Sequence, residues 1–117
     1  MKKIFHLANC TTCQRILKEI NPGKDVELRE IKSSPITQKE IEEMRKRTDS
    51  YESLFSRRAI KYRSMKLKEK KLTEEDYKKL ILEEYTFLKR PVAIIGDEIF
   101  IGNSKKVVES LYNALKK

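Results

Sequence analysis

Two cysteines separated by two residues, in Cys10-Thr11-Thr12-Cys13, are the part of this chain best suited to chemistry. They follow a short apolar segment at 4–8 and precede apolar residues at helical spacing, Ile16 and Ile20. The first thiol would lie against the unpaired N–H groups and positive end of a helix, which stabilise a thiolate. The second would lie about one turn further on, within reach of a mixed disulfide at the first. This placement predicts reversible disulfide chemistry.

Two other interpretations of the cysteine pair have to be weighed: buried structural thiols, and half of a metal site. A zinc site needs about four ligands, whereas the chain has one histidine, His6, and no third cysteine. We therefore expect no bound metal and interpret His6 as a strand residue without a chemical role. Redox chemistry is favoured, because a helix start is a typical place for a reactive thiol.

Composition narrows the class of protein. The 117 residues, 38% hydrophobic and 38% charged, suit one domain with a modest core. No segment is long and apolar enough to span a membrane, so no membrane partner is expected. The cysteines form one close pair instead of a disulfide framework, which favours a reducing compartment, and we expect the cytoplasm.

The basic charge of the chain is unevenly distributed. The formal net charge is +9, and its excess is concentrated between Arg57 and Lys71, where Glu69 is the only acidic residue. We favour a solvated lysine-rich face there, because Tyr62 is the only aromatic residue in the stretch and nucleic-acid sites are stronger with an aromatic platform. Direct nucleic-acid binding is therefore not expected, while an acidic protein partner is an alternative.

Periodicity and capping residues predict the elements that position the cysteines. Thr37 with Glu40, and Thr73 with Asp76, form the capping boxes of two helices. Glycine at the first position of the 96–97 turn predicts a two-residue hairpin. The expected strands are 3–8, 26–31, 92–95 and 98–101, and the expected helices are 11–20, 37–48, 73–84 and one opened by 102–104, with a short helical piece at 51–55.

The order of these elements predicts an α/β fold of the thioredoxin-like (glutaredoxin-like) class. A β-α-β unit with short connections implies two parallel strands, and a terminal β-β-α unit completes a mixed four-stranded sheet. Residues 1–117 are expected to form a single domain with a helical insertion at about 36–89, which leans on the sheet. Within the insertion, an apolar stripe predicts buried positions: Tyr77, Leu80, Ile81 and Tyr85.

Four segments in this order carry a family signal: 9–13, 54–62, 88–92 and 101–103. Together they resemble the arsenate reductase/Spx family, a branch of the thioredoxin-like proteins, over nearly the whole chain. In arsenate reductases of this type a cysteine attacks arsenate, glutathione joins, and glutaredoxin regenerates the thiol. Cys10 matches that nucleophile, and Cys13 is expected to act as the resolving thiol. Glutathione is expected as a co-substrate, with no bound cofactor.

The resemblance also implies roles for residues around the cysteines. Arg90 matches an arginine of the oxyanion site, and Pro91 matches a proline that such folds usually hold in the cis form beside the active sulfur. Thr11 and Thr12 have hydroxyls and amides that can hydrogen-bond sulfur. Arg58 is expected either to face the thiolate or to lie on the solvated basic face.

The chain departs from arsenate reductases at two positions, since Ser56 and Gly102 stand where they carry arginines. A full set of arginines suits a doubly charged oxyanion. Gly102, Arg58 and Cys13 instead resemble the Spx and YffB-type branches. Members of the YffB type look like glutathione-linked thiol enzymes, and Spx-like members are redox-sensing transcription regulators that contact RNA polymerase.

Two functions therefore stay open. As an oxidoreductase, the protein would reduce a disulfide or a small oxyanion and be restored by glutathione and glutaredoxin or by a thioredoxin-type reductant. As an Spx-like regulator or binding module, it would use the disulfide between Cys10 and Cys13 as a switch, and its basic surface would meet an acidic partner. Turnover distinguishes the two, because a switch is oxidised once and stoichiometrically.

Overall fold

The computed structural model describes residues 1–116. Its strands are β1 (Lys2–His6), β2 (Glu27–Glu30), β3 (Val92–Ile95) and β4 (Glu98–Ile101). Its α-helices are α1 (Thr11–Ile20), α2 (Gln38–Arg45), α3 (Ile60–Ser64), α4 (Glu74–Glu83) and α5 (Lys105–Lys116). Short 3-10 helices occupy Glu52–Leu54 (η1), Leu67–Glu69 (η2) and Tyr85–Phe87 (η3). The chain divides into two compact units, one made of Met1–Ser34 with the segment from Arg90 onward, the other of Pro35–Lys89.

The first unit is a mixed four-stranded sheet with the strand order β2-β1-β3-β4. Strand β1 is parallel to β2 and antiparallel to β3, and β3 and β4 form the predicted hairpin. Gly96 opens the hairpin turn at a φ of 64°, a conformation that favours glycine. The predicted thioredoxin-like class, with its β-α-β and β-β-α units, is confirmed.

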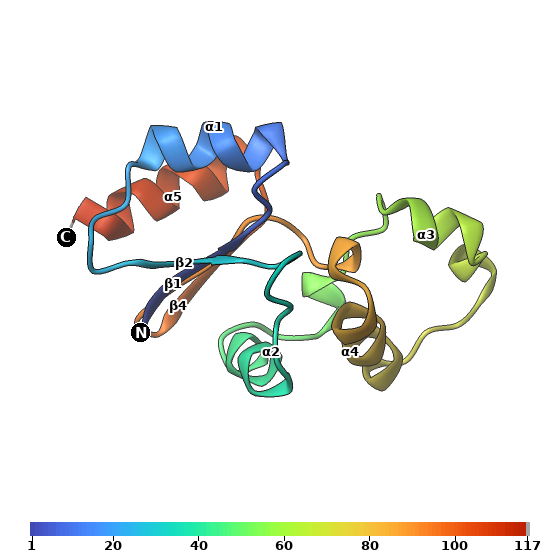
Figure 1. Ribbon diagram of the computed structural model, residues 1–117. Coiled ribbons are helices and arrows are strands. Elements are labelled where there is room, and N and C mark those ends of the chain that lie inside the picture. Colours follow the sequence, from blue (N-terminus) through green and yellow to red (C-terminus); the bar gives the residue numbers. More distant parts are fainter. Residues whose placement is uncertain (117) are drawn as a thin grey trace. The chain divides into compact units, whose positions relative to one another are not determined.

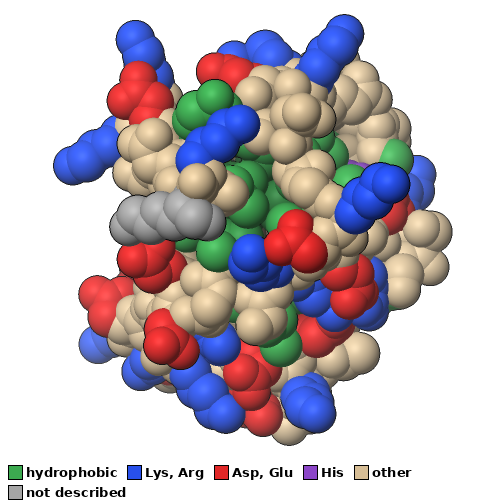
Figure 2. Space-filling view, turned by 90° about the vertical axis from the view of Figure 1, so that its left-hand side faces the viewer, with side chains coloured by type: hydrophobic (Ala, Val, Ile, Leu, Met, Phe, Trp, Pro, Cys, Tyr) green, Lys and Arg blue, Asp and Glu red, His purple; other side chains and the backbone are tan. Residues whose placement is uncertain are grey.

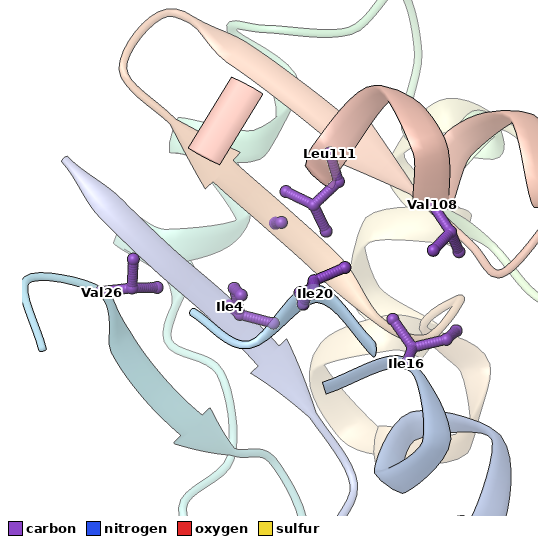
Figure 3. Packing of buried hydrophobic residues seen from close by; sticks show 7 residues of the cluster. Ile4, Ile16, Ile20, Val26, Val108 and Leu111 are labelled. Atoms are coloured by element: carbon purple, nitrogen blue, oxygen red, sulfur yellow. The ribbon is translucent and has the colours of Figure 1, made fainter. Parts of the chain in front are cut away.

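Helices α1 and α5 lie side by side on one face of this sheet (Figure 1). Figure 3 shows how Ile4 of β1 meets Ile16 and Ile20 of α1 and Val108 and Leu111 of α5. All of these side chains are at least about nine-tenths buried. Burying such apolar side chains is the main stabilising contribution to the packing of α1, and it fixes the N-terminal end of α1 relative to the end of β1.

The second unit contains α2, α3 and α4 with the three 3-10 helices. Both predicted capping boxes are present, at Thr37 of α2 and Thr73 of α4. Phe55 stacks on Phe87 and contacts the rings of Tyr62 and Tyr77. The compact unit coincides with the predicted insertion, and the expectation that it leans on the sheet stays a prediction.

Several predicted boundaries and burials are wrong in detail. Strand β1 ends at His6 instead of residue 8, and α2 ends at Arg45 instead of about residue 48. Helices α3, η2 and η3 were not predicted from the sequence. On the predicted apolar stripe, Tyr77 and Ile81 are buried, whereas Leu80 and Tyr85 are only partly so.

We expect Thr37→Ala to lower the free energy of unfolding by about 1 kcal/mol, because it removes an N-cap oxygen. The Thr37 hydroxyl accepts from the Glu40 N–H at 3.2 Å, while the Glu40 carboxylate accepts from the Thr37 N–H at 2.9 Å. Urea unfolding measures the change. Lys39→Ala in the same helical turn is the control, and an equal loss in that variant would contradict the capping argument.

Charged side chains of both signs cover much of the surface. On the face drawn in Figure 2, Lys and Arg are interspersed with Asp and Glu instead of forming one patch. No helix within residues 1–116 has the length and hydropathy needed to cross a membrane.

Candidate active site

Cys10 occupies the N-cap of α1, immediately after the turn that leaves β1. The turn is closed by the Cys10 N–H, which donates to the Leu7 carbonyl at 3.1 Å. The Cys10 carbonyl then accepts the first helical hydrogen bond from the Gln14 N–H at 3.0 Å. The predicted placement of the first thiol at the positive end of a helix is thus confirmed.

The surroundings of Cys10 favour its thiolate. Partial burial raises the pKa of Cys10, but the N–H and side chain of Cys13, the N–H of Thr12 and the charge of Arg90 outweigh this, so the pKa is lowered overall. Thr12 contributes through its backbone, while a role for the hydroxyls of Thr11 and Thr12 stays a prediction.

Cys13 has the opposite environment. Its side chain is fully buried, and burial, together with the nearby Cys10 thiolate, raises the pKa of Cys13 to about 11 despite a backbone hydrogen bond from Leu7. Both cysteines are free thiols in the structure. The two cysteines therefore differ: the thiolate form of Cys10 is favoured, whereas Cys13 stays protonated near neutral pH.

Arg90 and Pro91 lie next to the cysteines at the start of β3. The Arg90–Pro91 peptide bond is cis, as predicted. The charge of Arg90 lowers the pKa of both cysteines. Its Nη1 atom is buried and has no hydrogen-bond partner among residues 1–116. A buried guanidinium nitrogen without an acceptor is costly unless an anion completes the site.

Gly102 follows directly after β4 and is one of the two positions that lack the arginine of arsenate reductases. Its N–H donates to the Pro91 carbonyl at 2.9 Å, and its φ is 91°. Few residues other than glycine adopt this conformation without strain. An arginine at this position would therefore be disfavoured by the backbone as it stands.

A model of the ArsC family matches residues 5–111 of this chain. The chain belongs to the ArsC family. As a member of this family, the chain is a thiol redox protein and belongs to the oxidoreductases. No curated protein matches the chain.

Solved structures show the same fold as this ArsC-family chain. Protein SACOL0876 from Staphylococcus aureus is 28% identical, with a TM-score of 0.73 and coverage of 94% of this chain and 97% of the other. A protein named YFFB is 17% identical, with a TM-score of 0.79 and coverage of 98% and 99%. An arsenate reductase from Vibrio cholerae is 13% identical, with a TM-score of 0.72 and coverage of 97% of both chains.

The candidate site combines Cys10, Cys13, Arg90 and Pro91 within the first unit. Arg58 belongs to the second unit, and its action on the thiolate stays a prediction. Among residues 1–116 no cluster of three or more His, Cys, Asp or Glu side chains could hold a metal ion.

Arg58 lines a cavity of about 510 Å³ in the basic stretch of the second unit. Other basic residues around it are Arg57, Arg63, Lys66 and Lys68. Arg57 pairs with Glu52 at 2.7 Å, but the other four have no ion-pair partner within the described part of the chain. The cavity is thus lined by five basic side chains and one acidic side chain, Glu69.

Glu30, which lies at the end of β2, was not predicted to have a role. Its carboxylate accepts the N–H of Ala8, two residues before Cys10, at 2.9 Å. His6, also without an assigned role, has a buried Nδ1 atom that lacks a hydrogen-bond partner within residues 1–116. Burial lowers the pKa of His6, although Glu30 opposes the shift, so the imidazole is neutral at neutral pH.

We expect iodoacetamide to modify Cys10 alone in the native protein at pH 7, with Cys13 labelled only after unfolding. The lowered pKa and partial exposure of Cys10 favour its attack, whereas Cys13 is buried and protonated. The labelling rate should fall as pH drops below the pKa of Cys10, because only the thiolate reacts. Peptide mass spectrometry assigns the label, and native labelling of Cys13 first would contradict the division of roles.

Proposed function

We propose that this ArsC-family protein is a thiol-disulfide reductase linked to glutathione and glutaredoxin or to a thioredoxin-type donor. The observation that carries the proposal is the opposite pKa shift of Cys10 and Cys13 beside the buried, unpartnered Arg90 nitrogen. Cys10 is the nucleophile, Cys13 remains protonated until the second step, and the cation of Arg90 can attract an anionic substrate.

In the first step, the Cys10 thiolate attacks one sulfur of a substrate disulfide. A bond forms between Cys10 Sγ and that sulfur, the substrate S–S bond breaks, and the second substrate sulfur leaves as a thiolate. The cation of Arg90 favours the thiolate form of Cys10 before attack and attracts carboxylate-bearing substrates such as glutathione disulfide.

In the second step, Cys13 gives its proton to the thiolate released in the first step or to water, and its sulfur attacks Cys10 Sγ. This breaks the mixed disulfide, releases the reduced substrate thiolate and leaves a disulfide between Cys10 and Cys13. The Cys10 charge is among the causes that raise the pKa of Cys13. Since the mixed disulfide carries no charge on Cys10, its formation itself makes Cys13 easier to ionise. Two external thiols then restore both cysteines and leave as a disulfide.

Arsenate is the oxyanion that tests this function most directly. Ser56 and Gly102 replace two arginines, and the backbone of Gly102 has a φ of 91°. This leaves Arg90 as the cation that we expect to bind an oxyanion. We therefore expect glutathione disulfide to be reduced faster than arsenate.

The decisive experiment is steady-state turnover of arsenate with glutathione plus glutaredoxin and with thioredoxin plus its reductase, and of glutathione disulfide with thioredoxin plus its reductase. Turnover of either substrate that depends on Cys10 supports the reductase. Absence of turnover with every pair, while the Cys10–Cys13 disulfide forms readily, would overturn it.

A redox switch is the second candidate, and the positively charged cavity of the second unit favours it. Cations without ion-pair partners attract an acidic protein surface. In this function the oxidised and reduced forms would bind RNA polymerase with different affinities, as the resemblance to Spx implies. Surface plasmon resonance with both forms measures that difference, and equal affinities would exclude the switch.

A further inference from the structure

We propose that Glu30 is a positioning residue for the nucleophile Cys10. Its carboxylate binds the peptide group between Leu7 and Ala8, whose carbonyl accepts the Cys10 N–H. The inference rests on the proposed nucleophilic role of Cys10. It is carried by hydrogen bonds that join two neighbouring strand ends far apart in the sequence.

The peptide group between Leu7 and Ala8 is held at both of its polar atoms. Its N–H, from Ala8, donates to Glu30 Oε2 at 2.9 Å. Its C=O, from Leu7, accepts the Cys10 N–H at 3.1 Å. A charged acceptor on the N–H polarises the peptide group, which strengthens its carbonyl as the acceptor for Cys10. The carbonyl of Ala8 accepts from the side-chain amide of Gln14, so the turn is fastened to α1 as well.

The carboxylate itself is fixed by further donors. Glu30 Oε1 accepts the N–H of Lys32 at 3.0 Å and both the N–H and the hydroxyl of Ser33 at 2.8 Å. Backbone hydrogen bonds from Ala8 and Ser33 are the main causes that lower the pKa of Glu30 to about 2. Glu30 thus stays ionised over the whole pH range in which Cys10 titrates.

The position of Glu30 follows from the parallel pairing of the strands. His6 and Glu30 are register partners at the ends of β1 and β2, and the Ile31 N–H donates to the His6 carbonyl at 3.0 Å. Glu30 therefore lies beside the point at which β1 gives way to the Cys10 turn. The pKa of Cys10 is lowered mainly by the N–H and side chain of Cys13 and the N–H of Thr12, which all lie in α1. The orientation of the turn therefore determines how well these groups hydrogen-bond to the Cys10 sulfur.

Two effects of removing Glu30 have opposite signs, which makes the proposal testable. A nearby negative charge disfavours a thiolate, so charge removal alone would lower the pKa of Cys10. Loss of positioning moves the sulfur away from its N–H donors and raises that pKa. We expect Glu30→Ala to raise the pKa of Cys10 and to slow its alkylation about fivefold at pH 7, where less thiolate is present.

The experiment is the pH profile of Cys10 alkylation by iodoacetamide, which needs no substrate and thus also reports when the proposed reductase function fails. Glu27→Ala, which removes an exposed carboxylate from the same strand, is the matched control and should leave the profile unchanged.

Glu30→Asp keeps the charge but shortens the side chain by one methylene, and we expect the pKa of Cys10 to rise there too. An unchanged or lowered pKa in Glu30→Ala would overturn the proposal. Should that variant not fold, an unchanged profile in Glu30→Asp would do so.

Discussion

Cys10→Ser should lower turnover of any substrate of this protein at least about a thousandfold, which corresponds to about 4 kcal/mol of activation free energy. A serine hydroxyl is protonated at neutral pH, and the N–H groups that stabilise the thiolate of Cys10 cannot ionise it. The loss should appear in kcat/KM for both glutathione disulfide and arsenate.

Cys13→Ser is the matched variant, and it should fail at the later step. The Cys10 thiolate still attacks, but no second thiol lies within the site to release the mixed disulfide. Intact mass spectrometry should then show the protein with one glutathione attached after exposure to glutathione disulfide, whereas the wild type should accumulate the internal disulfide. Accumulation of no adduct in Cys13→Ser, with Cys10 still reactive, would contradict the resolving role of Cys13.

Local signals in the sequence predicted the elements that position the site. The apolar residues of 4–8, followed by Ile16 and Ile20 at helical spacing, place Cys10 at a helix start with no knowledge of tertiary structure. The capping boxes at Thr37 and Thr73 likewise depend only on residues three apart, and both are present. Arg90 and Pro91, in contrast, are some 80 residues from Cys10, and the family resemblance alone indicated them.

Other features depend on pairing that the local sequence does not encode. Glu30 gained no role because its contact with Ala8 follows from the register of two parallel strands. The available signal was a polar residue at the carboxyl end of β2, the strand next to β1, which leads into the Cys10 turn. Leu28 pairs in register with the fully buried Ile4 yet is 49% exposed, because β2 is an edge strand. Helix α3 was missed because its five residues are too few for a periodic pattern.

Arg90→Met should produce the second large effect, and the effect should depend on substrate charge. The variant removes a cation whose Nη1 is buried and unpartnered while keeping an unbranched side chain. For the anionic glutathione disulfide we expect kcat/KM to fall about a hundredfold, similar to the loss of one charge-stabilising donor. For neutral bis(2-hydroxyethyl) disulfide the loss should stay below about tenfold, because only the raised pKa of Cys10 contributes. Arg90→Lys should recover part of the rate, since it keeps the charge without the forked geometry.

The matched control for Arg90→Met is Arg15→Met, which removes an exposed cation from α1, the helix that carries Cys13. Net charge changes equally in the two variants, so a nonspecific effect of charge on substrate approach would appear in both and would weaken with added salt. An effect of the Arg90 guanidinium, whose Nη1 is buried, should be confined to Arg90→Met and persist at high salt. Equal losses for the anionic and the neutral disulfide in Arg90→Met would mean that Arg90 acts only through the ionisation of Cys10, and the anion-binding part of the proposed mechanism would then be wrong.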